Sequence, residues 1–384
     1  MILGIDIGGS TTKIIGTDGG SINTPVIVKA DDKKASLYGA LGKFIDINDL
    51  DLSGVDKIML TGVGASYVKK PIYGRPTYKV PEFTAIGKGG LALSNLSEAI
   101  IVSMGTGTAI VKASRIKGEI VHLGGTGIGG GTIEGLGKKM IGLSENKALV
   151  TLAEKGDKNK IDLTIGDITD DALENLPRGT TASNFGNVGD STRDEDLAYG
   201  ILNLVFESIA TTARFAMVNN EVDSAVLIGN LSRLKMCEKV FKSLGELFNI
   251  NFVIPKYSEF ATALGAALSE GIDVREDLQQ EEFDRKKLAV ELEKDLRSKW
   301  EEAFKAGYDK SYLEKMVTKF GIVDTIKKLL YSNTIASGFY VLMENGYKDY
   351  TVEAHVISDK YKGLFTKEEI EMSLHRLNAN SNNK

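Results

Sequence analysis

The chain has 384 residues, enough for two or three domains, with the charged and hydrophobic fractions of an ordinary globular protein. Its net charge of −5 gives no general reason to expect nucleic acid or an anionic membrane as a partner. Its single cysteine, Cys237, excludes an intrachain disulfide, and no run approaches the roughly 18 apolar residues of a membrane span, so we expect a cytoplasmic protein.

The chain opens with a pattern typical of a β-hairpin. Two runs of β-forming residues, Ile2–Ile7 and Thr12–Gly16, flank Gly8, Gly9 and Ser10. Next come a predicted helix, a buried strand that ends in TGVGAS, and a second helix; their expected ranges are 34–44, 57–61 and 81–93.

A second strand–turn–strand pattern, AIIVSMGTGTAIVKA, follows at residues 99–113. Laid over the first hairpin at an offset of 97 residues, it places Ser103 on Asp6, Gly105 on Gly8 and Thr108 on Thr11. A repeated pattern of this kind predicts two similar subdomains that face each other across a cleft.

The rest of the chain divides into a glycine-rich part and a glycine-poor part. A glycine-rich stretch at 124–137 is followed by a polar insert near 157–171, the loop TTASNFGNV, a long amphipathic helix over about 194–218 and the strand–turn segment DSAVLIGNLSRL. From Arg275 to Lys384 glycine is sparse and Lys and Glu dominate with helical periodicity. We expect a boundary at about 272–285 and a separate helical module, whose last helix begins with a capping box of Thr366 and Glu369.

The first hairpin has the residues of a phosphate-binding turn. Gly8 and Gly9 let backbone N–H groups approach an anion, and the residues after them add hydroxyl groups and one positive charge, from Ser10, Thr11, Thr12 and Lys13. Asp6 cannot bind phosphate directly but suits Mg²⁺ held through water. Alone, the motif is equally compatible with a plain β-turn.

Two further glycine segments favour a nucleotide site. The second hairpin offers donors in Gly105, Thr106, Gly107 and Thr108, and GGGTIEG provides a helix N-terminus that favours phosphate or close nucleotide approach. None of the segments matches the Walker A pattern or places the Rossmann GxGxxG pattern after the first strand, which indicates another nucleotide-binding fold.

Phosphoryl transfer to a hydroxyl group benefits from a base near the acceptor. The candidate is Glu82 in KVPEFTAIG, because Pro81 at a helix start places it in the first turn. The alternative is an ordinary N-terminal glutamate that complements the helix dipole.

Together these motifs resemble the type II pantothenate kinases, of the superfamily of acetate and sugar kinases, heat-shock chaperone ATPases and actin. The resemblance covers residues 1–270; residues 275–384 resemble no family that we name. It is carried by DIGGSTTK, TGVGA, PEF, MGTGT, GGTGIGGGTIEGLG, KGDKNKIDL, TTASNFGNV and LIGN. It implies an α/β fold of duplicated actin-like (ribonuclease H-like) ATPase subdomains around a nucleotide cleft, at about 1–95 and 96–272, with an α-helical C-terminal module at 285–384.

The resemblance also implies roles for individual residues. Glu82 aligns with the family's catalytic base, and the nucleotide-binding positions are Asp6, Ile7, Gly8, Gly9, Ser10, Thr11, Thr12, Lys13, Thr106, Gly130, Gly131, Thr132, Ile133, Glu134, Asn146 and Asn230. The implied reaction moves the γ-phosphate of ATP, with Mg²⁺, to the primary hydroxyl of pantothenate, the first step towards coenzyme A. Family members are usually homodimers built around long helices, here including residues 197–218.

One position departs from the family. The arginine that grips the pantothenate carboxylate is replaced by His122 in GEIVHLGG. A neutral imidazole donates one hydrogen bond and cannot form a bidentate charged contact. Arg115 and Lys117 are near enough in sequence to compensate; otherwise His122 is a polar residue at a strand end or marks a modified substrate site.

Three functions are therefore open. The first is a kinase of pantothenate or of a related pantetheine-like or other small alcohol. The second is an ATPase switch similar to the activators of 2-hydroxyacyl-CoA dehydratases, which need two cysteines per subunit where this chain has one. The third is a degenerate kinase domain that serves as a binding module, with the C-terminal helices engaging a partner. His355 and His375 are too far apart in sequence to suggest a metal site.

Overall fold

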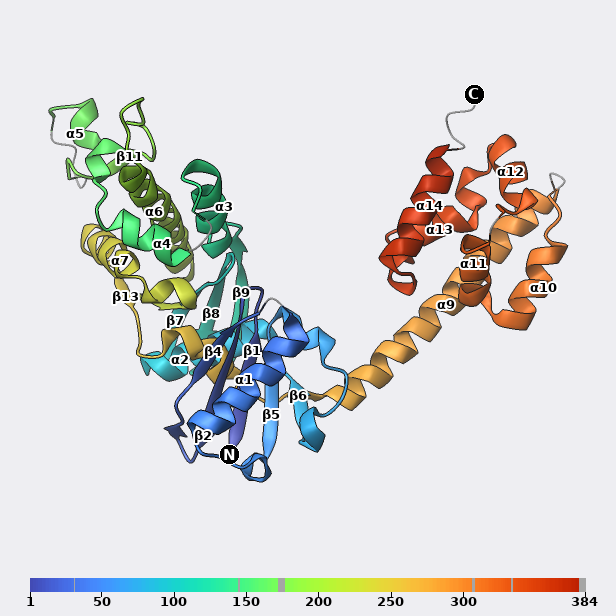
Figure 1. Cartoon of the computed structure of the whole chain (residues 1–384), viewed down its shortest axis with the longest axis horizontal. Coiled ribbons are helices and arrows are strands. Elements are labelled where there is room, and N and C mark those ends of the chain that lie inside the picture. Colours follow the sequence, from blue (N-terminus) through green and yellow to red (C-terminus); the bar gives the residue numbers. More distant parts are fainter. Residues whose placement is uncertain (31, 144–145, 172–176, 306–307, 333, 380–384) are drawn as a thin grey trace. The chain divides into compact units, whose positions relative to one another are not determined.

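The computed structural model describes residues 1–30, 32–143, 146–171, 177–305, 308–332 and 334–379, with the backbone alone described at 146, 277–281 and 305. The chain forms two compact units, Met1–Arg275 and Glu276–Lys384 (Figure 1).

The strands form two main sheets and a small third one. The 7-stranded first sheet has the order β14-β6-β5-β1-β2-β3, with β4 also paired to β2; the second sheet has the order β13-β12-β7-β8-β9, and β10 pairs with β11. The strands are β1 (Ile2–Ile7), β2 (Thr11–Asp18), β3 (Ser21–Ile22), β4 (Val26–Lys29), β5 (Lys57–Thr61), β6 (Thr77–Lys79), β7 (Glu98–Met104), β8 (Thr108–Ser114), β9 (Glu119–Thr126), β10 (Leu163–Thr164), β11 (Thr181–Ser183), β12 (Ser224–Ile228), β13 (Asn251–Val253) and β14 (Ile272–Asp273).

The helices lie between these strands and fill the C-terminal unit. The α-helices are α1 (Lys33–Ile47), α2 (Glu82–Ser94), α3 (Gly130–Met140), α4 (Asn146–Ala153), α5 (Ile165–Ile168), α6 (Asp194–Asn220), α7 (Lys235–Phe248), α8 (Ala261–Ala267), α9 (Val274–Lys305), α10 (Ser311–Phe320), α11 (Ile322–Leu330), α12 (Ser337–Glu344), α13 (Val352–Ile357) and α14 (Lys367–Ala379). The 3₁₀ turns are η1 (Leu52–Gly54), η2 (Val63–Tyr67), η3 (Ile72–Gly74), η4 (Lys158–Lys160), η5 (Asn230–Arg233), η6 (Ser258–Phe260), η7 (Lys348–Tyr350) and η8 (Lys362–Leu364).

Both expected hairpins are present, each at the centre of its sheet. In the first sheet β1 pairs with β2 so that Asp6 lies opposite Lys13, and in the second sheet β7 pairs with β8 so that Met104 lies opposite Thr108. Each turn has three residues between its strands. This repeat confirms the expected α/β class with two similar subdomains.

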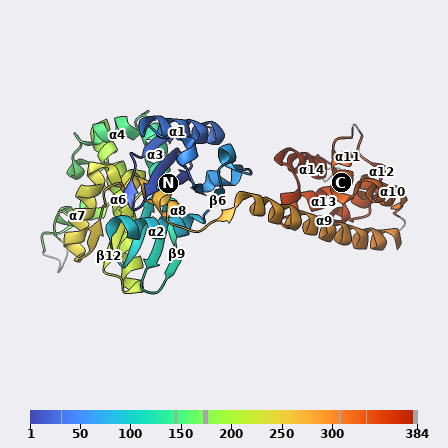
Figure 2. The same ribbon diagram turned by 90° about the horizontal axis from the view of Figure 1, so that it is seen from below.

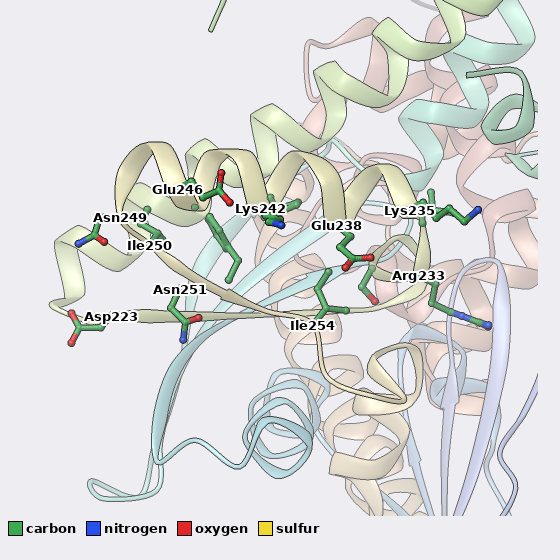
Figure 3. A pocket seen from close by; sticks show the side chains of 15 residues that line it. Asp223, Arg233, Lys235, Glu238, Lys242, Glu246, Asn249, Ile250, Asn251 and Ile254 are labelled. Carbon is green, nitrogen blue, oxygen red and sulfur yellow. The ribbon is translucent and has the colours of Figure 1, made fainter. Parts of the chain in front are cut away.

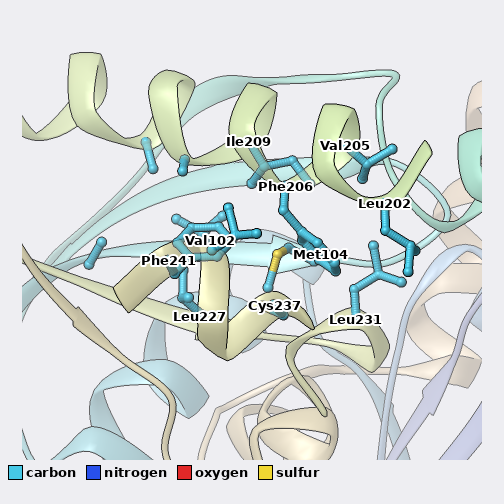
Figure 4. Close-up of a cluster of buried hydrophobic side chains, with 14 of the residues drawn as sticks. Val102, Met104, Leu202, Val205, Phe206, Ile209, Leu227, Leu231, Cys237 and Phe241 are labelled. Atoms are coloured by element: carbon cyan, nitrogen blue, oxygen red, sulfur yellow. The ribbon is translucent and has the colours of Figure 1, made fainter. Parts of the chain in front are cut away.

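The long helix α6 forms the core of the second subdomain. Apolar side chains on one face of α6 contact β7, β12 and α7, and Phe206 and Phe241 meet edge to face with 6.3 Å between ring centroids (Figure 4). By length and composition alone α6 could cross a membrane, but half of its apolar stretch is buried inside the protein. We interpret it as a core helix, because such helices pass the same test.

Two helices are exchanged between the subdomains. Helix α2 lies before residue 95 in the sequence, yet its Ile86 and Leu91 pack against β7, β8 and β12 of the second sheet. Helix α8 comes from the second half of the chain and packs on β1, β2 and β5 of the first sheet. Each subdomain therefore includes a helix from the other side of residue 95.

Glycines allow α2 and α8 to touch through their backbones. A Cβ atom at Gly89 would lie 1.8 Å from the carbonyl oxygen of Ala261, and one at Gly265 would lie 1.8 Å from that of Ala85. On the other side of α8, a Cβ at Gly4 of β1 would lie 1.9 Å from the carbonyl oxygen of Ala263. No side chain fits at these positions, so the joint between the sheets is close-packed.

The C-terminal unit has its own core. The second half of α9 contributes Leu292, Leu296 and Trp300, against which α10, α11, α13 and α14 pack (Figure 2). Ile322, Ile326 and Leu330 of the apolar stripe in α11 are buried in this core, and Leu329 is half-buried against it. The predicted capping box of α14 is confirmed, since Thr366 and Glu369 exchange hydrogen bonds of 2.8 and 3.2 Å.

Candidate nucleotide and acceptor site

The two glycine hairpins meet at their turns. The hydroxyl oxygens of Ser10 in the first turn and Thr106 in the second are 3.4 Å apart. A Cβ atom added at Gly9 would lie 3.1 Å from the hydroxyl oxygen of Thr106. Asn230, at the start of η5, donates from Nδ2 to the hydroxyl oxygen of Thr11 at 3.2 Å. The structure thus brings together three segments that lie about 100 residues apart in the sequence.

The first turn offers fewer side-chain donors than its sequence suggests. Thr12 is fully buried and its hydroxyl lies 3.0 Å from that of Ser36 in α1, so it faces away from the cleft. Ile7 is also buried in the core of the first sheet. Gly9 and Ser10 are exposed, and Thr11 is half-buried. The turn can therefore reach a phosphate through its backbone and through Ser10 and Thr11.

Asp6 and Lys13 form a buried ion pair beneath the turn, with 3.7 Å between Lys13 Nζ and Asp6 Oδ2. Burial raises the pKa of Asp6, and the Lys13 ammonium opposes this shift. Gly62, whose φ is +84°, passes so close that a Cβ there would lie 2.6 Å from Asp6 Oδ1. The TGVGA segment therefore needs glycine at this position.

The donor set fits Mg²⁺ bound mainly by phosphate. Among the described residues no group of three or more His, Cys, Asp or Glu side chains is arranged to hold a metal ion. Mg²⁺ does not require one, because it usually keeps several waters and takes one or two carboxylates together with substrate phosphates. Asp6, at the end of β1 beside the turn, is such a carboxylate.

The N-terminus of α3 is docked onto the second hairpin. The N–H groups of Gly130 and Gly131 donate to the carbonyl oxygens of Gly105 and Thr106 at 2.9 Å, and those of Thr132 and Ile133 donate to Gly129 at 3.1 Å. Contrary to expectation, these donors are already used inside the protein. Helix α3 can therefore contribute close backbone approach and its dipole, but not these N–H groups.

The remaining predicted nucleotide-binding residues of α3, and Asn146 of α4, differ in their surroundings. Ile133 is buried in the core of the second subdomain, whereas Glu134 is exposed. Asn146 begins α4, and its side chain lies outside the described part of the chain. Thr108 is buried and its hydroxyl donates to the carbonyl oxygen of Ile128 at 2.9 Å, which holds the glycine segment against the hairpin.

Asn230 has one side-chain atom without a protein partner. Its Oδ1 is buried and accepts no hydrogen bond from the described residues, while its Nδ2 holds Thr11. Gly229 before it has a φ of +93°, and a Cβ there would lie 2.4 Å from the carbonyl oxygen of Met104. The LIGN segment thus fixes Asn230 between the two hairpins, with its buried Oδ1 left without a protein donor among the described residues.

Glu82 is the first residue of α2, directly after Pro81. The residue is exposed, yet partial desolvation of its carboxyl group raises its pKa and the negative charge of Asp6 raises it further. Strand β6, which leads into α2, is parallel to β5, and β5 is parallel to β1, so all three strands end at the same edge of the first sheet. The start of α2 with Glu82 therefore lies at the edge where the first hairpin turns.

His122 is close to this base. Its ring stacks on Phe83, the neighbour of Glu82, with 3.8 Å between ring centroids and 8° between ring planes. His122 lies on β9, the edge strand of the second sheet, and is exposed. The position that departs from the family thus contacts Phe83, the residue that follows the candidate base.

Arg115 and Lys117 do not compensate for the missing arginine. Both residues lie in the β8–β9 turn, on the far side of Glu119 from His122. Glu119 and His122 are three residues apart on the extended strand β9, which is about 10 Å. The Arg115 guanidinium donates to the carbonyl oxygen of Leu91 at 2.8 Å, and Lys117 lies 3.8 Å from Glu98. Both cations have partners at the turn.

The KGDKNKIDL and TTASNFGNV segments are joined to α6 by buried polar contacts. Asp162 is fully buried and accepts from the backbone of Phe185 at 2.9 Å and from Asn203 of α6 at 2.7 Å. Glu207 of α6 accepts from Thr181 at 2.7 Å and Asn184 at 3.0 Å. These segments therefore hold α6 and the polar insert together; their contacts give them a structural role.

A cavity of about 780 Å³ lies along α7 (Figure 3). Arg233 and Lys235 lie at one end, next to the turn that carries Asn230, and Asp223 and Asn249 lie at the other. Arg233 is paired with Glu259 at 3.2 Å. No residue of the two hairpin turns, all of which are described, lines this cavity, but its lining includes Ser232 and Arg233 of the turn that begins at Asn230.

Similar proteins point to one family. The family model described as Fumble matches residues 92–266. The type II pantothenate kinase of Oceanobacillus iheyensis is 32% identical over 205 residues, which are 51% of this chain and 76% of that protein. The type II pantothenate kinase of Staphylococcus aureus (strain USA300) is 30% identical over 243 residues, 60% of this chain and 84% of that protein.

Solved structures of lower identity show the fold. The activator of the 2-hydroxyisocaproyl-CoA dehydratase from Clostridium difficile with bound ADPNP has a TM-score of 0.51 at 16% identity and covers 73% of this chain and 97% of that chain. Component A of the Acidaminococcus fermentans (R)-2-hydroxyglutaryl-CoA dehydratase has a TM-score of 0.51 at 15% identity, with 70% and 96% covered. The fold is that of the actin-like ATPases, and by its sequence relatives the chain belongs to the type II pantothenate kinase family.

Proposed function

We propose that the protein is an ATP-dependent kinase that phosphorylates the primary hydroxyl of pantothenate or of a pantetheine-like alcohol. The observation that carries this proposal is the placement of Glu82. Glu82 begins its helix at the edge of the first sheet where the hairpin turns after Asp6, and the next residue, Phe83, stacks on His122 of the exposed strand β9. A base beside a phosphate-binding turn is the arrangement that phosphoryl transfer requires.

In this proposal, different residues of the chain bind the phosphates and accept the proton. The backbone N–H groups of the first turn and the hydroxyls of Ser10, Thr11 and Thr106 hold the phosphates, because donors aimed at transferred oxygens stabilise the transition state. Glu82 accepts the proton of the acceptor hydroxyl, and its raised pKa makes it a better base than an ordinary glutamate. Mg²⁺, when bound near Asp6 through water, supplies further positive charge to the phosphates.

The His122→Arg substitution tests whether pantothenate is the native acceptor. If pantothenate is the native acceptor, a guanidinium at this position restores a charged contact to its carboxylate, worth about 1.5–3 kcal/mol. We expect the KM for pantothenate to fall by roughly tenfold or more, since 1.4 kcal/mol is a factor of ten. Steady-state kinetics with pantothenate and with the uncharged alcohol pantetheine measure this.

His375→Arg, the same change at an exposed position of the C-terminal unit, is the matched control and should leave both KM values unchanged. A loss of pantothenate turnover in His122→Arg, with pantetheine turnover also reduced, would show that the acceptor pocket is built for a different molecule.

The ATPase-switch alternative receives no support from the cysteine. Cys237 is fully buried in the core of the second subdomain, and burial raises its pKa, so its thiol is not available to bind a cluster shared with another subunit. The similarity to the dehydratase activators is one of fold. The degenerate-module alternative is disfavoured by the retained Asp6–Lys13 pair and by Glu82.

Measurement of ADP production separates the alternatives. A several-fold increase that depends on added pantothenate or pantetheine supports the kinase. Hydrolysis at the same rate with and without acceptor would favour the switch, and no turnover with any acceptor would favour the binding module. The fragment 1–274 assayed beside the full chain tests whether the C-terminal unit changes activity.

A further inference from the structure

A second lysine contacts the phosphate-binding turn from behind. Lys33, the first residue of α1, places its Nζ 2.7 Å from the carbonyl oxygen of Gly8 and 2.6 Å from that of Gly9. The residue is half-buried. Lys33 is not part of the glycine motif of the turn, because it lies more than twenty residues away along the chain.

These two contacts fix the orientation of the turn. In a trans peptide the C=O and N–H groups point in opposite directions, and the described chain contains no cis peptide. When the oxygens of Gly8 and Gly9 point towards Lys33, the N–H groups of Gly9 and Ser10 must therefore point away from it. Both residues are exposed.

These N–H groups are available to a ligand. The N–H of Gly8 donates to Thr11 at 2.9 Å, and the oxygen of Ser10 accepts from Ala30 at 3.0 Å, so the ends of the turn are satisfied. Within the described part of the chain, the N–H groups of Gly9 and Ser10 have no acceptor. Two adjacent free N–H groups form an anion-binding concavity.

The ammonium is itself held in place. The side chain of Asp32 accepts from the backbone N–H groups of Lys34 and Ala35 at 2.8 and 2.9 Å, which fixes the first turn of α1. The buried contact between Ser36 and Thr12, 3.0 Å, ties the same turn of helix to β2. Lys33 therefore has a defined position relative to the hairpin rather than a free surface orientation.

We infer that Lys33 is a positioning residue for nucleotide binding: it holds the turn with the N–H groups of Gly9 and Ser10 directed at the phosphates and adds a positive charge behind them. The inference rests on the proposed use of ATP. It does not require Lys33 to touch the nucleotide, and it is independent of the identity of the acceptor.

Lys33→Met tests it, because methionine keeps an unbranched side chain and removes the charge and the donors. Calorimetric titration without acceptor compares ADP, which carries phosphates, with adenosine, which does not. We expect the affinity for ADP to fall roughly tenfold to a hundredfold, in line with the loss of charge-assisted hydrogen bonds, and the affinity for adenosine to stay unchanged. Lys33→Arg should recover most of the ADP affinity.

Lys34→Met is the matched control, since Lys34 is the exposed neighbour on the same helix, and it should bind both ligands like the unaltered protein. An unchanged ADP affinity in Lys33→Met, or an equal loss for ADP and adenosine with a lowered melting temperature, would overturn the inference. Absence of ADP binding to the unaltered protein would also overturn it. Lys33-dependent ADP binding in a protein that phosphorylates no acceptor would instead overturn only the proposed function.

Discussion

Glu82→Gln is expected to lower kcat by roughly 10²–10⁴-fold, the contribution typical of a general base, and to leave the affinity for ATP within about twofold. Glutamine has the same shape as glutamate but cannot accept the proton of the acceptor hydroxyl. Rapid-quench or coupled-assay measurement of kcat, with titration of ATP on the same variant, checks both parts. Glu119→Gln, at an exposed position of β9, is the control and should retain full activity.

The pH profile gives a second test of the same residue. The pKa of Glu82 is raised, by desolvation and then by Asp6, and the base works only when it is deprotonated. Activity should therefore be constant at higher pH and fall as the pH drops through this raised pKa, earlier than for an unperturbed glutamate. A Glu82→Gln enzyme with normal kcat, or a profile that is flat through the acidic range, would assign the proton to another group.

Gly265→Ala is expected to destabilise the N-terminal unit by about 3 kcal/mol or more, or to prevent folding, because overpacking of a close-packed contact is felt at once. The added Cβ would lie 1.8 Å from the carbonyl oxygen of Ala85 and 2.6 Å from the backbone nitrogen of Gly89. These are backbone atoms, which cannot rotate away as a side chain can. Chemical denaturation followed by circular dichroism measures the loss.

Gly42→Ala is the matched control in α1. A Cβ at Gly42 meets no atom within 4 Å, and the residue is exposed. Alanine should stabilise the helix by roughly 0.5–1 kcal/mol, the difference between the two residues in helix propensity. If Gly265→Ala were as well tolerated as Gly42→Ala, the backbones of helices α2 and α8 would have to lie further apart than these distances.

The features that the sequence predicted correctly are those that depend on residues close together in the chain. Both hairpins follow from glycine turns between β-forming runs, and the 97-residue offset between them identifies their equivalence by sequence comparison alone. The buried strand at 57–61 and the capping box at Thr366 are local in the same sense. For Glu82, the sequence predicted its place in the first turn of a helix, but only the structure shows that this helix starts at the same edge of the first sheet as the turn after Asp6.

Other features depend on tertiary contacts that leave no local pattern. The exchange of α2 and α8 between the sheets is not visible in either helix, although their closely spaced glycines are a signal of backbone contact. Thr12 looks like another phosphate donor, but strand alternation turns its hydroxyl towards α1. The N–H groups of Gly130 and Gly131 look free until α3 is seen docked on the second hairpin. Lys33 could have been noticed only as a lysine that opens the helix after the hairpin.

The exchanged helices have a consequence for the spacing between the two halves of the candidate site. Asp6 and Lys13 belong to the first sheet, whereas Glu82 begins a helix that packs on the second. The two sheets are joined where α2 and α8 touch through backbone atoms at Gly89 and Gly265. We therefore expect a substitution at this joint to shift Glu82 relative to Asp6 without touching either residue.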